Sequence, residues 1–358
     1  MSDANDGRRY FLKTALVSAG AVAGTFFVGG IAHAQFARDP TVREIAKRAL
    51  TTRVLCEGIY LGDGARWRQG RLWFSDFFAN AVKSVSLAGD LRTEVEIDDW
   101  PSGLGWMPDG SLLIVSMKKR QVLRRSVDGK IDVHADLNHI AKFHCNDMVV
   151  DSKGRAYVGD FGFDLFKDMY ARGFESVIAD HPTAKLACVL PDGTAREVAT
   201  DVQFPNGPAI TPDGKTFILA ETLGEKLSAF DIEADGSLTN RRIWARASPR
   251  GVLKSAHAST ESVHTAFHLL PDGIALDAHG HVWVANAYGP QCVLFSRGGE
   301  VLEVIDTGMP CFGVMLGGDD GRTLFMLTAP TSDPAVASLS PRAKVVIATV
   351  DVPHAGLP

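Results

Sequence analysis

The chain has 358 residues, 46% of them hydrophobic, and its 37 basic and 42 acidic residues give a formal net charge of −5 at pH 7. A chain of this length buries enough apolar surface to form a large globular core. The near balance of charge leaves no extended basic surface for nucleic acid or acidic lipid, and nucleic acid is therefore not an expected partner.

The first 34 residues have the pattern of a twin-arginine export signal. Arg8-Arg9 precedes Phe11-Leu12-Lys13, residues 14–31 are uncharged, and Ala32-His33-Ala34 offers the small residues that signal peptidase accepts. We expect export of the folded chain by the Tat translocase, cleavage after Ala34, and a periplasmic or secreted product. The alternative is an uncleaved anchor, since about 18 apolar residues just span a bilayer. The many glycines and alanines make this a weak span, so no stable membrane association is expected.

Beyond the predicted signal peptide of residues 1–34, we expect a short linker or helix over residues 35–50 and one domain over residues 51–358. The five cysteines show no CxxC spacing, which argues against a zinc knuckle or a thioredoxin-type site. Export permits a disulfide, but the odd count leaves at least one thiol free or intermolecular. The sequence leaves the pairing open among Cys56, Cys145, Cys188, Cys292 and Cys311.

One pattern recurs six times along the chain. It is a turn that ends in glycine and is followed at once by a short strand, and the copies begin between 40 and 66 residues apart. This spacing suits propeller blades of four strands with loops of different length. A further β-rich run follows most copies, and helix-like periodicity is scarce outside residues 41–50. The copies begin at Gly70, Gly110, Gly154, Gly214, Gly280 and Gly321.

These repeats predict an all-β fold, a six-bladed β-propeller with four-stranded antiparallel blades. A β-sandwich would not explain six equivalent hairpins. The last copy lacks partners, and residues 53–60 form a β-like run left over near the mature amino end. We expect this run to pair into the last blade and close the ring, because closure removes two exposed sheet edges.

The repeat also locates candidate functional residues. In a blade the innermost strand precedes the hairpin glycine, so residues seven or eight positions before that glycine begin a strand beside the central channel. In five of the six copies this residue carries a polar oxygen, and radial repetition predicts that the five meet around one axis. Counted in this way, with one or two extra residues in the last copy, the positions are Asp63, Ser102, Asn146, Asn206, Asp272 and Phe312.

Two carboxylates and two carboxamides at these positions predict an oxygen-rich cation site. Hard ligands without thiols favour Ca²⁺, with Mg²⁺ or Mn²⁺ next and Zn²⁺ less expected. The alternative is that Asn206 and Asp272 belong to ordinary turns, and that Asp63 is a turn aspartate with Glu57 as a rival carboxylate. Asp272, however, lies eight residues ahead of its own hairpin glycine, Gly280.

Three more acidic residues, Asp76, Asp160 and Glu221, end the second strands of their copies. These second strands run back toward the same rim, so their acidic residues could support the metal ligands. We expect them instead to form hydrogen bonds from blade to blade.

At these positions the chain resembles the SMP-30/gluconolactonase family over nearly all of residues 54–330. The matching stretches are Gly62-Asp63-Gly64-Ala65-Arg66-Trp67, Pro101-Ser102-Gly103-Leu104-Gly105-Trp106, Asn146-Asp147-Met148-Val149-Val150-Asp151, Phe204-Pro205-Asn206-Gly207 and Pro271-Asp272-Gly273. Each stretch alone is weak, but together they are specific.

The resemblance implies a six-bladed propeller that holds one divalent cation through a Glu, an Asn and an Asp and hydrolyses sugar or other lactones. Carried over by position, these ligands become Asp63, Asn206 and Asp272, and Asp272 also becomes the base. A further asparagine of the family, which contacts substrate or metal, corresponds to Asn146. Ser102 joins Asn146 as an expected substrate contact.

Two departures from the family pattern stand out. The first ligand is Asp63 where the family has Glu, and Ala65 replaces the proline that follows, so metal geometry or affinity is expected to differ. The second is a long segment, residues 247–267, which contains His257 and His264 and is a candidate lid.

The implied mechanism has the cation polarise the lactone carbonyl while Asp272 helps to deprotonate the attacking water. The chain has no Gly-x-Ser-x-Gly elbow, which argues against an α/β-hydrolase route. His144 and His268 compete as general bases, but packing or surface positions are expected for both. Cys145 and Cys311 are expected to pack rather than to act as nucleophiles.

Several aromatic residues are expected near the same rim, and those that wall the pocket would favour a substrate less polar than a plain sugar lactone. These aromatic residues are Trp67, Trp106, Phe143, Phe204 and Phe312.

Two other functions stay open. One is hydrolysis of phosphotriesters or other esters at the same site, and the other is a non-catalytic propeller that binds a ligand or an exported protein. A deep pocket over Asn146 and Asp272 would favour catalysis, and a flat surface would favour binding.

Overall fold

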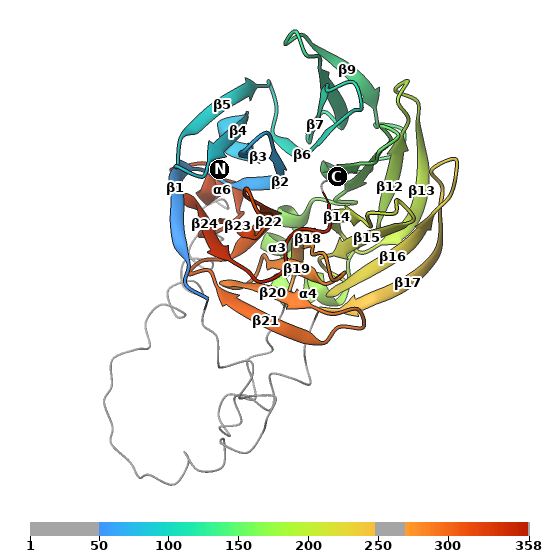
Figure 1. Cartoon of the computed structure of the whole chain (residues 1–358). Coiled ribbons are helices and arrows are strands. Elements are labelled where there is room, and N and C mark those ends of the chain that lie inside the picture. Colours follow the sequence, from blue (N-terminus) through green and yellow to red (C-terminus); the bar gives the residue numbers. More distant parts are fainter. Residues whose placement is uncertain (1–49, 248–268, 357–358) are drawn as a thin grey trace, which may run out of the picture.

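Six four-stranded antiparallel sheets surround a central axis in a computed structural model that describes residues 50–247 and 269–356 (Figure 1). This confirms the predicted six-bladed propeller. The expected signal peptide, the expected linker or helix before Leu50, and the candidate lid beyond Ala247 with His257 and His264 lie outside the described residues. Among the described helices, none is long and apolar enough to cross a membrane.

Each blade is described from its innermost to its outermost strand. Blade 1 contains β2 (Gly62–Arg68), β3 (Arg71–Asp76), β4 (Ala81–Ser86) and β5 (Leu91–Glu96), and blade 2 contains β6 (Pro101–Trp106), β7 (Leu112–Ser116), β8 (Gln121–Arg125) and β9 (Ile131–Asp136). Blade 3 contains β10 (Cys145–Val150), β11 (Ala156–Asp160), β12 (Ala184–Val189) and β13 (Ala195–Val202), and blade 4 contains β14 (Pro205–Ile210), β15 (Thr216–Glu221), β16 (Lys226–Ile232) and β17 (Leu238–Arg246). Blade 5 contains β18 (Pro271–Leu276), β19 (Val282–Asn286), β20 (Gln291–Phe295) and β21 (Val301–Asp306), and blade 6 contains β22 (Cys311–Gly317), β23 (Thr323–Thr328), β24 (Ala343–Thr349) and β1 (Arg53–Ile59).

Helical segments lie between the second and third strands of blades 1, 3 and 6. Between β11 and β12 lie α3 (Leu165–Arg172) and α4 (Phe174–Ala179), which the sequence did not predict. The side chain of Asp164 caps α3 by accepting a 3.1 Å hydrogen bond from the backbone N–H of Lys167. In blade 6 the short helix α6 (Pro334–Ala337) follows β23, and a 3₁₀ turn, η2 (Phe77–Ala79), follows β3.

The ring is closed by strand β1, which pairs antiparallel with β24 as expected from the leftover run near the mature amino end. Arg53 lies opposite Ile347, and Ile59 lies opposite Ala343. Ile59 is fully buried in the core, whereas Val54 on the same strand is 46% exposed. The pairing covers the outer edge of blade 6, so a segment from the start of the described chain completes a blade formed by its end.

The six innermost strands share one local geometry. Each candidate residue found by the repeat is the second residue of its strand, from Asp63 in β2 to Phe312 in β22. The pairing of each inner strand with the next strand is irregular at this point, as between Pro271 and Ile274. A β-bulge changes the direction of the side chains beside it, and here the bulges lie at the residues that line the rim of the channel.

Glycine follows the second residue in five of these six strands, because the neighbouring inner strand lies very close. A Cβ at Gly103 would lie 2.2 Å from the backbone nitrogen of Met148, and one at Gly207 would lie 2.6 Å from the carbonyl oxygen of Asp272. The inner strands therefore pack backbone against backbone around the channel. Blade 3 is the exception, since Asp147 stands where the other blades have glycine.

The acidic residues at the ends of the second strands hold the chain where it enters each blade. Asp76 accepts hydrogen bonds from the backbone N–H groups of Tyr60 and Leu61, and Asp160 accepts them from Lys142 and Phe143. These backbone segments connect the preceding blade to the blade of the acidic residue. The carboxylates therefore fix the links between blades and are already satisfied, so they leave no free oxygen for the channel.

Ile59→Ala is expected to lower the free energy of unfolding by about 2–5 kcal/mol, because it empties a buried site on the closing strand. The control Val54→Ala removes an exposed side chain from the same strand and is expected to change stability by about 0.5 kcal/mol or less. Urea unfolding followed by circular dichroism measures both variants. Equal stability of the two would show that β1 does not contribute to the closed ring.

Candidate active site

The structure brings four of the predicted residues together at one mouth of the central channel. Asp63, Asn146, Asn206 and Asp272 line one cavity of about 450 Å³. Their side chains are nearly buried, with exposures of 5%, 2%, 6% and 6%. Residues separated by more than 200 positions in the sequence therefore form the floor of one partly open pocket, which is an arrangement suited to a ligand site.

Three of these residues direct an unsatisfied oxygen into the floor. One carboxylate oxygen of Asp63, one of Asp272 and the amide oxygen of Asn206 are buried and have no hydrogen-bond partner among the described residues. Asn206 donates its NH₂ group to Thr222 Oγ1 at 3.2 Å, and Thr222 in turn donates to the carbonyl oxygen of Pro271. This chain of bonds turns the amide oxygen of Asn206 away from Thr222 and leaves it as a free acceptor.

Asn146 is held more tightly than the other three. Its NH₂ group donates to the carbonyl oxygen of Pro205 at 3.1 Å, and its amide oxygen accepts a 3.4 Å hydrogen bond from Ser102 Oγ. Ser102 is fully buried and is not among the residues that line the cavity. The structure therefore places Ser102 behind Asn146, where it orients the amide, rather than at the surface of the pocket.

The channel beneath the floor contains buried charges of opposite sign. Burial and the neighbouring Asp147 carboxylate raise the pKa of Asp63, and burial together with Asp63 and Asp147 raises the pKa of Asp272. Burial also raises the pKa of Asp147 to about 6, although the guanidinium of Arg66 opposes this shift. Arg66 donates to the carbonyl oxygens of Ala65 and Met148 and is itself only 6% exposed.

The charges and the donor atoms together fit a divalent cation. When Asp63, Asp147 and Asp272 are ionised, the single guanidinium of Arg66 leaves two negative charges uncompensated in a buried space. Oxygen ligands from carboxylates and amides suit Ca²⁺, Mg²⁺ or Mn²⁺. The described part of the chain contains no group of three His, Cys, Asp or Glu side chains placed to hold a metal, and two of the four floor residues are asparagines.

The walls and roof of the cavity are apolar, and the roof comes from the helices that the sequence did not predict. Side chains of α3 and α4 line the cavity together with Phe204 and Phe312 from two of the blades. Tyr170 of α3 donates a hydrogen bond to Asp333 beside α6, and Phe174 of α4 stacks on Tyr288 of blade 5 with ring centroids 4.9 Å apart. These two contacts hold the helices in place over the floor.

Several sequence expectations for the rim are corrected by the structure. Trp67 and Trp106 are the sixth residues of their strands and lie about 13 Å further along the channel than the second residues, given the rise of a β-strand. Trp67 stacks on Phe325 in the core, and Trp106 borders a different cavity. Glu57 lies on strand β1, exposed and paired with Lys344, and so is no rival to Asp63.

The alternative reactive groups are packed as expected. His144 stacks on Phe143 at 4.1 Å and meets Trp100 edge-on, and burial lowers its pKa. Cys145 and Cys311 are buried, and burial raises the pKa of both thiols. All five cysteines lie within the described residues and none is paired with another. His268 lies outside the described residues.

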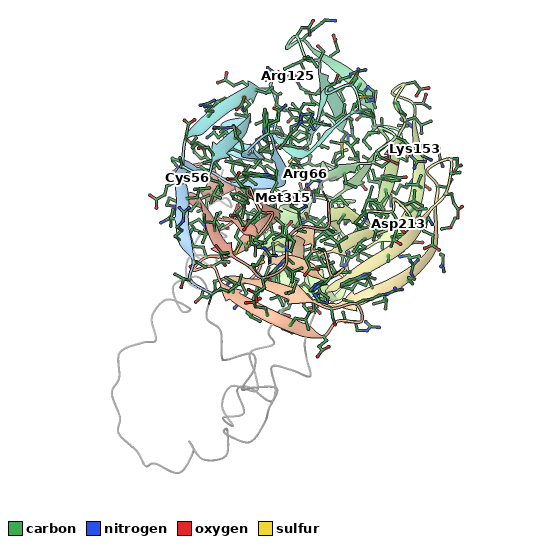
Figure 2. All side chains as sticks on the ribbon, in the orientation of Figure 1. Cys56, Arg66, Arg125, Lys153, Asp213 and Met315 are labelled. Atoms are coloured by element: carbon green, nitrogen blue, oxygen red, sulfur yellow. The ribbon has the colours of Figure 1, made fainter. Side chains whose placement is uncertain are left out.

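A second cavity, of about 640 Å³, lies at the opposite mouth of the channel. Its lining includes Arg66, Trp106, Met315 and residues 354–356 near the end of the chain, but none of the predicted site residues. Figure 2 shows Arg66 and Met315 close to the axis of the ring, whereas Arg125 lies toward its periphery. Arg66 thus separates the carboxylate-rich floor from the opposite mouth.

Fold and site together define a six-bladed propeller with an oxygen-lined ligand site at one mouth of its channel. The chain belongs to the SMP-30/gluconolactonase/LRE-like family, whose sequence profile matches residues 61–330. Asp63, Asn146, Asn206 and Asp272 all lie within this match.

Individual relatives are distant. The chain is 26% identical over 285 residues to the pentonolactonase XacC of Haloferax volcanii, a match that covers 78% of this chain and 84% of that protein. It is 23% identical over 255 residues to the diisopropyl-fluorophosphatase of Loligo vulgaris, covering 70% of this chain and 68% of that protein.

Among solved structures, the calcium-binding protein regucalcin from Agrobacterium tumefaciens superposes with a TM-score of 0.67. The sequence identity is 19%, and the match covers 87% of this chain and 97% of that chain. At this identity the likeness shows the fold alone.

Arg66→Met is expected to lower the free energy of unfolding by about 3 kcal/mol in the presence of a chelator, because it leaves buried carboxylates without their cation. The double variant Arg66→Met/Asp147→Asn removes one of those charges and is expected to recover part of the loss. Urea unfolding of the single and double variants measures the coupling.

The control is Arg68→Met on the same strand, where the guanidinium lies over the Trp106 ring at 4.9 Å. Loss of this contact is expected to lower the free energy of unfolding by about 1 kcal/mol. An Arg66→Met protein no less stable than Arg68→Met would contradict the charge pairing inferred for the channel.

Proposed function

We propose that the chain is a metal-dependent lactonase whose active site is the floor of the 450 Å³ cavity. The observation that carries this proposal is the set of three buried, unpartnered oxygens on Asp63, Asn206 and Asp272. Membership of the SMP-30/gluconolactonase/LRE-like family and the similarity to a pentonolactonase support it. The site is deep rather than flat, which favours catalysis over simple binding of a protein partner.

The cation would be held by Asp63, Asn206 and Asp272, with Asn146 beside them. Calcium is the first candidate, because all four side chains offer only oxygen and because a protein of the same fold is the calcium-binding regucalcin. Bound there, a divalent cation would polarise the ester carbonyl and stabilise the negative charge that develops on its oxygen.

The reaction adds one water across the ring ester of the lactone. The bond between the acyl carbon and the ring oxygen breaks, the hydroxyl of the water goes to the acyl carbon, and its proton goes to the ring oxygen. In this proposal Asp272, which lines the pocket, accepts the proton of the attacking water in addition to holding the cation. Asn146 of blade 3, held by Ser102 and Pro205, orients the substrate.

A second candidate function is the hydrolysis of phosphotriesters or related esters at the same floor. The similarity to a diisopropyl-fluorophosphatase favours it. The same oxygens would then hold the cation, and only the electrophile above it would differ.

Removal of the metal is expected to abolish lactone hydrolysis, and addition of one cation is expected to restore it. Asp272→Asn and Asn206→Ala are each expected to lose stoichiometric metal and to lower kcat by at least about a hundredfold, since each removes a group from the floor. A pH-indicator assay on a lactone panel, with metal content measured by mass spectrometry, tests both statements.

The matched control is Asp277→Asn. Asp277 is a buried carboxylate just beyond the far end of β18, where it accepts hydrogen bonds from the backbone of His279 and His281. This variant is expected to keep its metal and its activity. Stoichiometric metal in Asp272→Asn and Asn206→Ala would refute the ligand assignment, and activity against phosphotriesters alone would favour the second candidate.

We also propose that the protein acts outside the cytoplasm, on the strength of the twin-arginine pattern in residues 1–34. Lysine at both Arg8 and Arg9 is expected to retain the precursor in the cytoplasm, since the pair is the feature that the export machinery recognises. Immunoblots of cell fractions measure this, with Arg38→Lys, beyond the predicted cleavage site, as the control. Export of the double-lysine variant at the normal level would exclude the Tat route.

A further inference from the structure

The cavity above the floor has a sharp division of chemistry. Four polar residues gather at the bottom, Asp63, Asn146, Asn206 and Asp272, while most of the residues that line its walls are aromatic or aliphatic. Trp100 and Phe204 immediately precede the inner strands of blades 2 and 4, and Phe312 lies on the inner strand of blade 6. A ligand that places its reacting carbonyl on the floor must therefore extend the rest of its structure into apolar surroundings.

Two of the polar side chains that line the cavity, those of Asp333 and Thr222, form hydrogen bonds within the protein. Asp333 accepts hydrogen bonds from Tyr170 Oη and from the backbone N–H of Ala335, and it caps α6. Thr222 donates to the carbonyl oxygen of Pro271 and accepts from Asn206. These bonds hold the walls of the cavity together.

Within residues 50–247 and 269–356, the apolar face of the roof has no complete partner. Leu165, Phe166 and Met169 of α3 line the cavity, yet each is only half-buried, and no residue of α3 is fully buried. Lys167, between them in sequence, points to solvent. Residues spaced three and four apart share one helix face, so this face of α3 is turned toward the cavity and away from Lys167.

We propose that the substrate is a lactone whose ring carries a hydrocarbon group, and that the α3–α4 segment selects for that group. This inference rests on the proposed lactonase function and names its substrate class. The ester carbonyl lies on the oxygen-lined floor, and the hydrocarbon group completes the burial of the apolar face of α3. Each methylene that this face covers strengthens binding.

A sugar lactone would fit the same cavity poorly. It carries a hydroxyl on nearly every ring carbon, and each hydroxyl that enters the apolar walls loses its hydrogen bonds to water. An unpaired buried hydroxyl weakens binding roughly tenfold or more. The walls therefore discriminate against polyhydroxylated rings as well as in favour of hydrocarbon groups.

The test compares two six-membered lactones with the metal-loaded protein, one with a pentyl side chain (δ-decalactone) and the polyhydroxylated glucono-1,5-lactone. We expect kcat/KM to be at least about tenfold higher for δ-decalactone, after correction for spontaneous hydrolysis. Binding of the corresponding pentyl-substituted lactam, which resists hydrolysis, is measured in parallel by calorimetry.

A matched pair of variants assigns the preference to α3. Met169→Gln makes the roof polar with a residue of similar length and good helix propensity, and it is expected to lower kcat/KM for δ-decalactone roughly tenfold. Lys167→Gln introduces the same residue on the exposed face of the same helix and is expected to change kcat/KM less than about twofold. Neither residue is part of the catalytic floor.

The outcomes separate the two levels of the proposal. Equal or faster hydrolysis of glucono-1,5-lactone would overturn the substrate class and leave the lactonase function standing. Binding of the lactam without hydrolysis of either lactone would overturn the lactonase function and leave the apolar specificity of the pocket. Failure to bind the lactam, or an unchanged preference in Met169→Gln, would overturn the inference itself.

Discussion

Strand β1 pairs with β24 and thereby holds six separate sheets in one closed ring, with the innermost strand of each beside a common axis. The position of every functional side chain follows from this closure. The second residue of each inner strand lies at the same rim, and the bulge at that point turns it into the channel. The glycine that follows in five blades lets neighbouring backbones approach closely enough to keep the channel narrow.

The fold and the floor of the site could be predicted from the sequence because both depend on a repeated local distance. Seven or eight residues separate the start of an inner strand from its hairpin glycine, and this count is independent of the long and variable loops between blades. Asp63, Asn206 and Asp272 were found in this way although they are far apart in the chain. The same count places Trp67 and Trp106 only 3 and 4 residues before Gly70 and Gly110, at the hairpin end of the strand, so the expectation that they lie at the rim was wrong.

The roof could not be predicted in the same way, since α3 and α4 lie in an insertion between β11 and β12 that is not part of the repeated hairpin. Helices α3 and α4 have only eight and six residues and no fully buried face along α3, so the hydrophobic periodicity of an ordinary packed helix is weak. One indication was present in the sequence. Asp164 is a capping residue followed by apolar residues at 165 and 169, which is the spacing of a helix that begins there.

The two halves of the pocket thus have different structural origins, and this separates chemistry from specificity. The floor is imposed by the ring, and its buried excess of negative charge cannot change without disturbing Arg66 and the channel beneath it. The roof is attached to the ring through a few contacts, such as the Tyr170–Asp333 hydrogen bond and the stacking of Phe174 on Tyr288. An insertion held in this way can vary in sequence while the inner strands keep their geometry. A propeller of this design can therefore change the groups that its substrate carries without altering the oxygens that act on the ester.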